Sequence, residues 1–305
     1  METVKISNKI KNSGLRREEN LFGYLFVLPA VIGILLFIAY PLFVSFIGMF
    51  LDWSKYDNSV FQAQWNNFEN FKQVFGSAFG KYFWQSLFNT VFIMIGIPIG
   101  LVLSLVFAML LNREMKGVYI YRVLFYLPVV SSLVAVCIMW QKLLAPDGVL
   151  NSLLGFFGIK GPAWLVEEAT AKWSIIFLTV WKGLGSSILL YLAGLQGISK
   201  SYYEAAEVDG SGAFNTFIKI TVPLLYPTTF YLVVTGVIGG MQCYVEPQLL
   251  YGSSRLDTKT VVGYIFGKFG DDYLGEASVI SWFLAIIIFT ITAIQFIYNG
   301  RREKR

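Results

Sequence analysis

Long apolar runs dominate this chain, and they leave few folds open to it. The hydrocarbon core of a bilayer is about 30 Å thick, and a helix needs about 20 residues to cross it. Runs of this kind lie at about residues 22–50, 85–111, 118–142, 173–196, 222–247 and 278–298. The sequence therefore predicts an all-α membrane protein with six transmembrane helices.

The composition agrees with a membrane protein. Only 14% of the residues are charged and the mean hydropathy is +0.61, whereas soluble domains have about 25% charged residues. The first apolar run follows a basic start, but it is much longer than the roughly 7–15 residues of a signal-peptide core. We therefore expect it to be a spanning helix and not a removable leader.

Several kinds of chemistry are disfavoured by the residues present. The chain has no histidine, which removes the usual proton shuttle, the Ser-His and Cys-His nucleophile pairs and the commonest zinc ligand. Cys137 and Cys243 both lie inside apolar runs, where a small buried side chain is the ordinary interpretation. We expect no catalytic residue, no disulfide framework and no metal site.

The distribution of basic residues predicts the orientation. With the N-terminus inside, the inside segments 1–21, 112–122, 197–221 and 299–305 hold 14 Lys and Arg, and the outside loops hold nine. Short cytoplasmic loops are enriched in these residues. We expect cytoplasmic tails at residues 1–21 and 299–305, and a cytoplasmic loop at residues 200–221 between the fourth and fifth helices.

The loop at 200–221 has the signals of a helix-turn-helix. Ser201 and Glu204 form an S-x-x-E capping pattern, and Gly210 after Asp209 is a typical left-handed helix stop. Ser211 can cap a second helix that leads to Pro223 at the start of the fifth run. A simple interfacial connector would normally carry Lys or Arg toward lipid, but this one is acidic, which favours a protein partner.

The same segment resembles a known family signature. Glu204-Ala205-Ala206, three residues, Gly210, nine residues, Ile220, one residue and Val222-Pro223 resemble E-A-A-x-x-x-G-x9-I-x-L-P of the permease subunits of binding-protein-dependent ABC importers. Val222 in place of leucine is the one departure. Stretches such as "LPAVIGILLFIAYPL", "YRVLFYLPVVSSLVAV" and "WKGLGSSILLYLAGLQGI" extend the resemblance to carbohydrate-uptake permeases related to the larger maltose-transporter membrane subunit.

This resemblance implies an assembly and a division of labour. Residues 22–298 would form the six-helix transmembrane domain, beside a second related permease subunit, two ATPase subunits and an external solute-binding protein in a bacterial or archaeal cell membrane. ATP and Mg would bind to the ATPase subunits, with no cofactor on this chain. In the family the E-A-A loop docks into a cleft on the ATPase. The positions carried over for coupling are Glu204, Ala205, Ala206, Asp209, Gly210, Ile220 and Pro223.

The sequence itself supports ATP hydrolysis on another chain. A phosphate-cradling loop needs G-x4-G-K-[ST], in which backbone N–H groups and the lysine bind the phosphates. The nearest stretch is "GYIFGKF", which has three intervening residues and Phe269 in place of the hydroxyl. We therefore expect a transport subunit that is not itself an enzyme.

A substrate pathway is indicated by polar residues and glycines at membrane depth, because ionisable groups there are costly. In the fourth run these are Lys182, Gly183 and Ser186, and in the fifth Gly236, Gly239, Gly240, Gln242, Cys243 and Glu246. Lys182 could instead form a structural pair or extend to the interface, and Glu246 could simply mark the water boundary. We hypothesise that the glycines of the fifth run widen the cavity for an oligosaccharide or an unusually decorated sugar.

Two interpretations of function differ in class. In the first, the chain is the membrane subunit of an ABC sugar importer. In the second, it is an ion-coupled secondary transporter or channel that uses Lys182 and Glu246 and works without an ATPase, which leaves the acidic loop without a partner. The loop at 143–172 has a helical apolar rhythm ending at Gly161-Pro162, and it would lie under the binding protein or cover the bundle.

Overall fold

A computed structural model describes residues 22–54, 60–76, 80–113, 116–252 and 255–303. In these ranges four helices are long and apolar enough to span a membrane, namely Phe22–Gly48, Gly80–Leu111, Glu168–Gln196 and Leu274–Arg301. Two bent helix pairs pass the same test together, so the number of spans is four, or up to six if each pair counts as one. The prediction of a mainly helical membrane protein is confirmed, and the exact number of six transmembrane helices is not. The tail at 1–21 lies outside the described residues.

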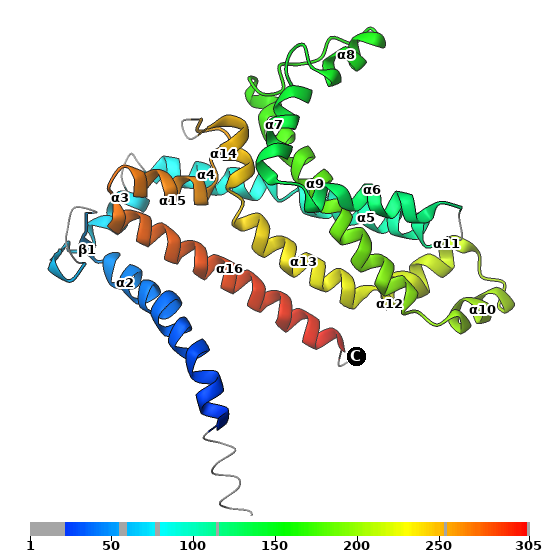
Figure 1. The fold of residues 1–305 in the computed structure, drawn as a ribbon, viewed down its shortest axis with the longest axis horizontal. Helices are drawn as coiled ribbons and strands as arrows, with labels where there is room; N and C mark the ends of the chain where they lie inside the picture. The colour runs from blue at the N-terminus through cyan, green and yellow to red at the C-terminus, as the bar shows by residue number, and fades with distance from the viewer. Residues whose placement is uncertain (1–21, 55–59, 77–79, 114–115, 253–254, 304–305) are drawn as a thin grey trace, which may run out of the picture.

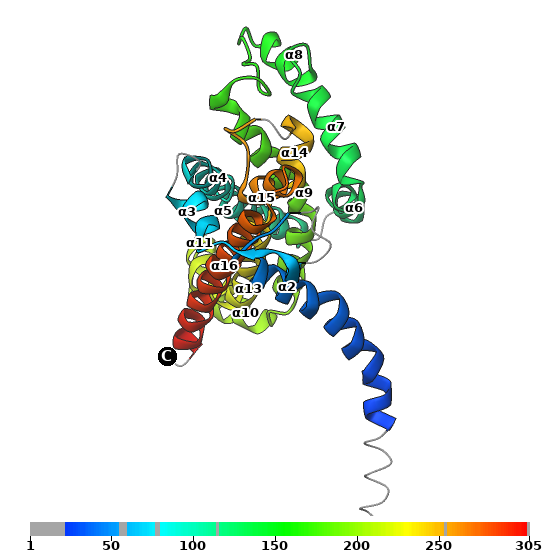
Figure 2. The same cartoon turned by 90° about the vertical axis from the view of Figure 1, so that its left-hand side faces the viewer.

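The first span stands apart from the rest of the chain. Residues 22–34 are helical and continue through a π-helical turn, η1 (Leu35–Ala39), into α2 (Tyr40–Gly48), with Pro41 near its start. Figures 1 and 2 show it leaving the bundle at an angle, so that only its α2 end packs on α16. Its most apolar stretch is not buried against the chain, so lipid or another protein must cover it.

A short β-hairpin follows, which the all-α prediction did not anticipate. β1 (Leu51–Asp52) pairs antiparallel with β2 (Gln64–Trp65), and η2 (Val60–Gln62) and α3 (Glu69–Phe75) complete the segment. The Asn70 side chain donates hydrogen bonds to the carbonyls of Met49 (3.1 Å) and Leu51 (2.9 Å). These bonds tie α3 to the hairpin, which lies at the end of the bundle opposite α10 (Figure 1).

The centre of the bundle is the pairing of α5 (Gly96–Leu111) with α9 (Glu168–Gln196). A Cβ added at Gly96 would lie 3.3 Å from both Ile176 and Val180, so a glycine permits this close approach. α4 (Gly80–Ile93) precedes α5, and the two are joined by a short break in the helix. Fully buried side chains such as Leu178, Ile188 and Tyr191 extend this core along α9.

The expected third helix, 118–142, is broken. α6 (Val118–Val130) and α7 (Leu133–Leu143) meet at 102°, with both connecting serines in extended backbone. Pro128 removes one backbone donor in the last turn of α6, which weakens the helix before the break. α6 packs along α9, and α7 turns outward to carry α8 (Val149–Phe156) away from the bundle (Figure 1).

The stop predicted for the helix in the loop at 143–172 was wrong. α8 ends before Gly158, which has φ +74°, and not at Gly161-Pro162. The Ile159 N–H donates to the Leu154 carbonyl at 2.9 Å, and the Gly158 N–H donates to the Gly155 carbonyl at 3.0 Å. This is the Schellman pairing that commonly ends a helix at a left-handed glycine.

The expected fifth helix, 222–247, is also divided. α10 (Lys200–Val208), α11 (Ala213–Thr216), η3 (Phe217–Thr221) and α12 (Val222–Leu224) precede α13 (Tyr226–Met241), which is bent 62° from the segment Ala213–Leu224. α14 (Val245–Tyr251), α15 (Val261–Gly270) and α16 (Leu274–Glu303) complete the chain. α16 continues beyond residue 298 into the segment predicted as a C-terminal tail.

Candidate functional site

The acidic loop forms a helix-turn-helix, as predicted, but its cap differs. The N-cap of α10 is Ser199, whose hydroxyl accepts a hydrogen bond from the Ser201 N–H at 3.4 Å. Ser201 is therefore the second residue inside the helix. The S-x-x-E pattern placed the cap two residues late because Ser199 and Ser201 have the same capping chemistry.

Gly210 forms the corner of this loop. Its φ is +70°, in the left-handed region that favours glycine. The Ser211 N–H donates to the Ala206 carbonyl at 2.8 Å, and the Gly210 N–H donates to the Glu207 carbonyl at 3.0 Å. The predicted stop is thus a Schellman motif. We call residues 199–212 the elbow.

The second arm of the loop differs from the prediction in two respects. Ser211 does not cap it, because the N-cap is Gly212, and the Ser211 hydroxyl instead accepts hydrogen bonds from the side chains of Asn215 (2.8 Å) and Thr216 (3.2 Å). The arm is also not collinear with α13, since the chain bends at Leu225. Ile220 lies in the π-helical turn η3, and Pro223 lies in α12.

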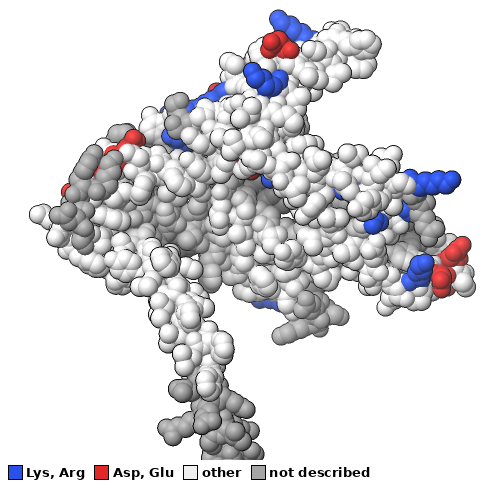
Figure 3. Space-filling model, viewed as in Figure 1, with Lys and Arg blue, Asp and Glu red and all other residues white. Residues whose placement is uncertain are grey.

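The elbow presents acidic groups around an apolar tip. Glu204, Glu207 and Asp209 are all exposed, and Val208 between them is 88% exposed. Figure 3 shows Asp and Glu at the end of the molecule that carries α10. The exposed carboxylates are complementary in charge to a basic surface of a protein partner. Val208 was not predicted; its place inside the acidic "EVDG" stretch was the available signal.

The two arms are joined by one side-chain hydrogen bond. The hydroxyls of Tyr203 on α10 and Thr221 in η3 lie 3.2 Å apart. Thr221 is buried, and the Ala206 methyl group of the E-A-A stretch is buried as well. The elbow is therefore packed on its second arm and does not hang free, so a force applied to one arm reaches the other.

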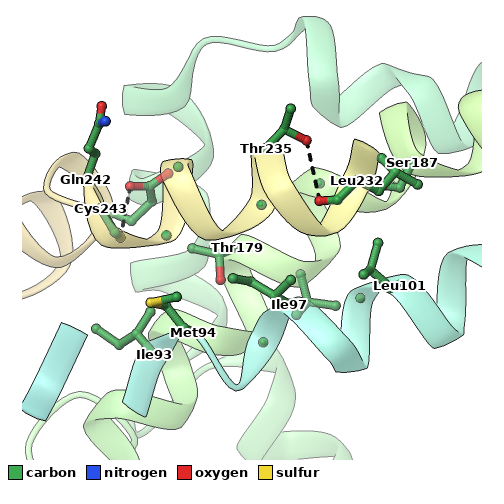
Figure 4. A pocket seen from close by; sticks show the side chains of 18 of the residues that line it. Ile93, Met94, Ile97, Leu101, Thr179, Ser187, Leu232, Thr235, Gln242 and Cys243 are labelled. Carbon is green, nitrogen blue, oxygen red and sulfur yellow. Dashed lines mark hydrogen bonds between the residues drawn. The ribbon is translucent and has the colours of Figure 1, made fainter. Parts of the chain in front are cut away.

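The residues predicted for the substrate pathway gather, with two exceptions, around a central cavity. The cavity has a volume of about 440 Å³ and lies between the break that joins α4 to α5, α9 and the glycine-rich face of α13 (Figure 4). Seven predicted residues line it, namely Gly183, Gly236, Gly239, Gly240, Gln242, Cys243 and Glu246. Ligand sites commonly have such volumes, about 300–1,000 Å³.

The three glycines of α13 do different things. A Cβ at Gly236 would lie 3.1 Å from Ile97, and one at Gly240 would lie 2.9 Å from Met94, so both permit close packing on the α4–α5 break. Gly239 has nothing within 4 Å of its would-be Cβ and lines the cavity. Space at this wall is therefore left mainly by Gly239.

Lys182 and Ser186, the two exceptions, do not line the cavity. The Ser186 hydroxyl donates to the Gly183 carbonyl one turn earlier at 3.0 Å. Lys182 is half-buried and forms no ion pair within the described ranges. Their neighbours Gly183 and Ser187 face the cavity instead, because successive helix residues point about 100° apart.

One part of the cavity wall is formed by the break that follows α13. The Cys243 thiol lies 3.7 Å from a Glu246 carboxylate oxygen, an interaction drawn in Figure 4. Glu246 is the one charged side chain among the described residues that line the cavity. Gln242 also lines the cavity, but in Figure 4 its amide points away from Met94 and Ile97.

The segment that carries Glu246, α14, is held by hydrogen bonds with two other elements, α7 and α9. The Gln141 side chain of α7 donates to the Leu249 carbonyl at 2.7 Å, and the Tyr251 hydroxyl donates to the Ala171 carbonyl of α9 at 2.9 Å. Burial raises the pKa of Tyr251 to about 12, so its hydroxyl remains a donor at neutral pH. α14 is thus fixed between α7 and α9.

Several lining residues were not predicted from the sequence. Ser104, Thr179 and Thr235 supply hydroxyl groups, and Met94 and Ile97 supply apolar surface. Ser104 is fully buried, and its hydroxyl has no hydrogen-bond partner among the described residues. Single hydroxyls in an apolar helix are weak signals, because such groups can bond to their own backbone, as Thr179 does to the Ile176 carbonyl. Within the described ranges no group of three or more His, Cys, Asp and Glu could hold a metal.

Comparisons with known proteins agree with this architecture. Residues 73–305 match the family model described as "Binding-protein-dependent transport system inner membrane component". The chain is 37% identical to the probable ABC transporter permease protein YesP of Bacillus subtilis, over 95% of this chain and 94% of that protein. It is 32% identical to the lactose transport system permease protein LacF of Rhizobium radiobacter, over 96% and 98%.

Two solved structures share the fold. One is a bacterial ABC transporter involved in the import of the acidic polysaccharide alginate, with a TM-score of 0.81, 23% identity and coverage of 95% of this chain and 99% of that one. The other is a bacterial alginate ABC transporter in complex with an alginate pentasaccharide-bound periplasmic protein, with a TM-score of 0.78, 22% identity and coverage of 91% and 93%.

Proposed function

The chain belongs to the family of inner membrane components of binding-protein-dependent transport systems, and on that basis we propose that it is the saccharide-carrying permease subunit of an ABC importer. Relatives in this family are transport subunits and not enzymes. The family supports the importer over the ion-coupled transporter or channel weighed from the sequence.

The partners proposed are two ATPase subunits, which would bind ATP and Mg, a second related permease subunit and an external solute-binding protein. The observation that carries the ATPase contact is the elbow, with three exposed carboxylates around an exposed apolar tip. The periplasmic protein in the similar alginate transporter complex supports the solute-binding partner. We further propose that the elbow and both chain ends are cytoplasmic, in a bacterial or archaeal cell membrane, on the charge distribution described above.

The geometry suggests how ATP-driven movement would reach the cavity. A push on the elbow passes through Tyr203 and Thr221 to the second arm. The arm ends at Leu225, which is 1% exposed. A Cβ at Gly194 of α9 would lie 2.9 Å from Leu225, so the bend is packed tightly on α9. α13 then continues directly to the glycines that line the cavity, so the bend is the point where rotation would turn the cavity wall.

The substrate proposed is an oligosaccharide. The relatives described above include a permease named for lactose, and the similar structures belong to importers of a polysaccharide. In this chain the central cavity combines hydroxyl groups from Thr179, Ser187 and Thr235 with apolar walls. Such a mixture can exchange hydrogen bonds with sugar hydroxyls and contact the apolar face of a sugar ring.

Co-purification of the complete importer tests the proposal. The chain is expressed with its genomic neighbours, and the ATPase that it retains is measured for wild type, Glu204→Lys and Asp147→Lys. Asp147 is an exposed acid between α7 and α8, two helices that lie away from α10 in Figure 1, and it serves as the control. We expect Glu204→Lys to lower ATPase retention about tenfold or more, because a charge reversal juxtaposes like charges, and Asp147→Lys to leave it unchanged.

Membrane insertion is measured in the same preparations and should be equal for all three proteins. If the Glu204→Lys variant retained as much ATPase as wild type, the elbow would not be part of the contact with the ATPase. Saccharide uptake that follows an ion gradient and persists without any ATPase would reject the proposed function as a whole.

A further inference from the structure

A groove borders the central cavity on the side of α16. It has a volume of about 470 Å³ and lies between α13 and α16, which pack on each other. The part contributed by α13 is Ile238 and Gln242. The part contributed by α16 is Ser281, Leu284, Ala285, Ile288, Phe289 and Thr292. We call it the seam groove. No residue of α16 was predicted from the sequence as part of a site.

Gln242 separates the seam groove from the central cavity. It is the one residue that lines both among the described residues, and in Figure 4 its amide points away from Met94 and Ile97 of the central cavity. Successive helix residues are about 100° apart, so Gln242 lies around α13 between Ile238, on the groove side, and Gly239, on the cavity side. A turn of α13 about its own axis would therefore join the two spaces.

Two polar groups of α16 lie at this seam without a partner. The Thr292 hydroxyl and the Gln295 side-chain oxygen are buried, and neither has a hydrogen-bond partner among the described residues. Ser281, Ile288, Thr292 and Gln295 follow one another at spacings of seven, four and three residues, which places them on one face of the helix. The groove-lining face of α16 thus carries the two unpaired groups.

The unpaired hydroxyl is unusual in this chain. Thr235 of α13 donates to the Tyr231 carbonyl at 2.8 Å, and Ser281 of α16 donates to the Ala277 carbonyl at 2.7 Å. Hydroxyls in apolar helices commonly bond to their own backbone in this way. Thr292 makes no such bond among the described residues. A polar group buried without a partner is costly, and such costs are typical of functional positions.

A neighbour packed on the outside of the chain could not pair these groups. Both oxygen atoms are already covered within this chain, so a second permease subunit or a lipid would not reach them while the seam is closed. Lipid tails also offer no hydrogen bond. A polar molecule that enters between α13 and α16 would pair them, and a saccharide supplies both donors and acceptors beside apolar C–H groups.

Movement of α13 would open the seam. The proposed push on the elbow turns α13 at Leu225, whereas α16 is one continuous helix, Leu274–Glu303, so the two helices would shift relative to each other. One turn beyond Thr292 the seam is closed by Phe230 of α13 and Phe296 of α16, whose rings meet edge to face with centroids 5.3 Å apart. Separation of these rings would extend the opened groove toward the C-terminal end of α16.

We propose that this face of α16 is a second saccharide-contact surface, reached when α13 turns and joins the seam groove to the central cavity at Gln242. The inference rests on the proposed function in taking the solute to be a saccharide and α13 to be a moving helix. A sugar would leave the central cavity past Gln242 and exchange hydrogen bonds with Thr292 and then Gln295.

The first experiment asks whether the seam opens to water. Thr292→Cys and Thr290→Cys are made separately in a Cys137→Ala, Cys243→Ala background, and reaction with a water-soluble methanethiosulfonate is followed in the complete importer in nanodiscs. We expect Thr292→Cys to react about tenfold faster or more during ATP hydrolysis than at rest, because only the open seam exposes it. Thr290 is exposed on the opposite face of α16, so Thr290→Cys should not respond to ATP.

The second experiment asks whether the hydroxyl contacts the sugar. Thr292→Val keeps the shape of the side chain and removes the unpaired group, so it should raise the thermal unfolding temperature of the importer. Uptake into proteoliposomes is measured for lactose, maltotriose, cellotriose and chitotriose, and Thr292→Val should lower uptake of the best of these about threefold or more. Thr292→Ser should restore uptake, and Thr290→Val should change neither property.

Three results would overturn the inference. The Thr292→Cys thiol reacts no faster during ATP hydrolysis, the Thr292→Val variant transports at the wild-type rate, or that variant loses unfolding temperature together with uptake, as expected of a hydroxyl that only supports packing. Failure of the proposed function would look different, because the wild-type importer would then take up no saccharide, whatever the reactivity at position 292.

Discussion

At the scale of single residues, glycines of this chain serve opposite purposes that the sequence does not distinguish. Gly210 is required for its left-handed backbone, Gly240 for close packing and Gly239 for open space. All three were predicted as functional positions. The structure shows why each position needs a glycine, through the backbone φ of Gly210 and the atoms nearest to a Cβ added at Gly239 or Gly240.

The first prediction concerns Gly210→Ala. An alanine costs about 1–2 kcal/mol in the left-handed region, so the Schellman turn of the elbow should be weakened. We expect a clear loss of ATPase stimulation by the loaded binding protein in proteoliposomes. Gly158→Ala is a matched control, because Gly158 ends α8 with φ +74° and the same hydrogen-bond pairing, but α8 lies away from α10 in Figure 1.

The control should lose comparable local stability and keep its ATPase stimulation. Equal losses in the two variants would mean that strain in any left-handed turn, and not the elbow in particular, limits coupling.

The second prediction compares Gly239→Leu with Gly240→Leu. At position 240 the new side chain would meet Met94 and Ile97, and overpacking of this kind costs about 1–3 kcal/mol. We expect Gly240→Leu to lower the thermal unfolding temperature. Gly239→Leu should instead fold normally and reduce uptake of long saccharides more than of short ones, because it fills part of the cavity.

The measurements are a thermal melt of the purified complex and uptake of a saccharide length series. If Gly239→Leu transported every length at the wild-type rate, the wall at Gly239 would not be in contact with the substrate.

At the scale of elements, hydropathy predicted where the apolar segments lie in the sequence, but it did not predict where the helices bend. The runs at 85–111, 173–196 and 278–298 each correspond to one continuous candidate span, which begins a few residues earlier than predicted. The run at 118–142 is also apolar enough to span a membrane, yet it turns by 102° between Val130 and Leu133. Pro128 is of a residue type that commonly kinks a helix, but the size of a bend depends on what each half of the segment packs against. Here α6 packs against α9, and α7 packs against α14.

The elbow was the most predictable element because its signals are local. An acidic helix, a glycine corner and a spacing pattern all lie within 24 residues, 200–223. The cavity between the β-hairpin, α3, α15 and the start of α16 could not be predicted, for the opposite reason. Its walls come from segments about 200 residues apart, such as β2 and the start of α16, and are brought together only by the fold.

At the scale of the whole molecule, the β-hairpin, α13 and the elbow follow one another across Figure 1, and α13 lines the central cavity. The first span, which packs on the chain only at its α2 end, does not take part in this line. Movement at the elbow can drive transport across the membrane only if the elbow and α8 face opposite sides of it. The predictions about ATPase coupling and saccharide uptake therefore depend on this orientation.

The chain offers two exposed positions for this test. Val208 on the elbow is 88% exposed, and Phe156 on α8 is 85% exposed. The variants Val208→Cys and Phe156→Cys would be made separately in a background of Cys137→Ala and Cys243→Ala, because those are the two native cysteines. A membrane-impermeant maleimide is then applied to right-side-out and inside-out vesicles.

We expect Phe156→Cys to react only in right-side-out vesicles and Val208→Cys only in inside-out vesicles, since the basic segments favour a cytoplasmic elbow. Coexpression of the ATPase should protect Val208→Cys and leave Phe156→Cys reactive. Labelling of both positions from one side would contradict the orientation. Labelling from opposite sides without protection by the ATPase would support the orientation but would mean that the ATPase does not cover Val208. The orientation and the ATPase contact are therefore tested separately.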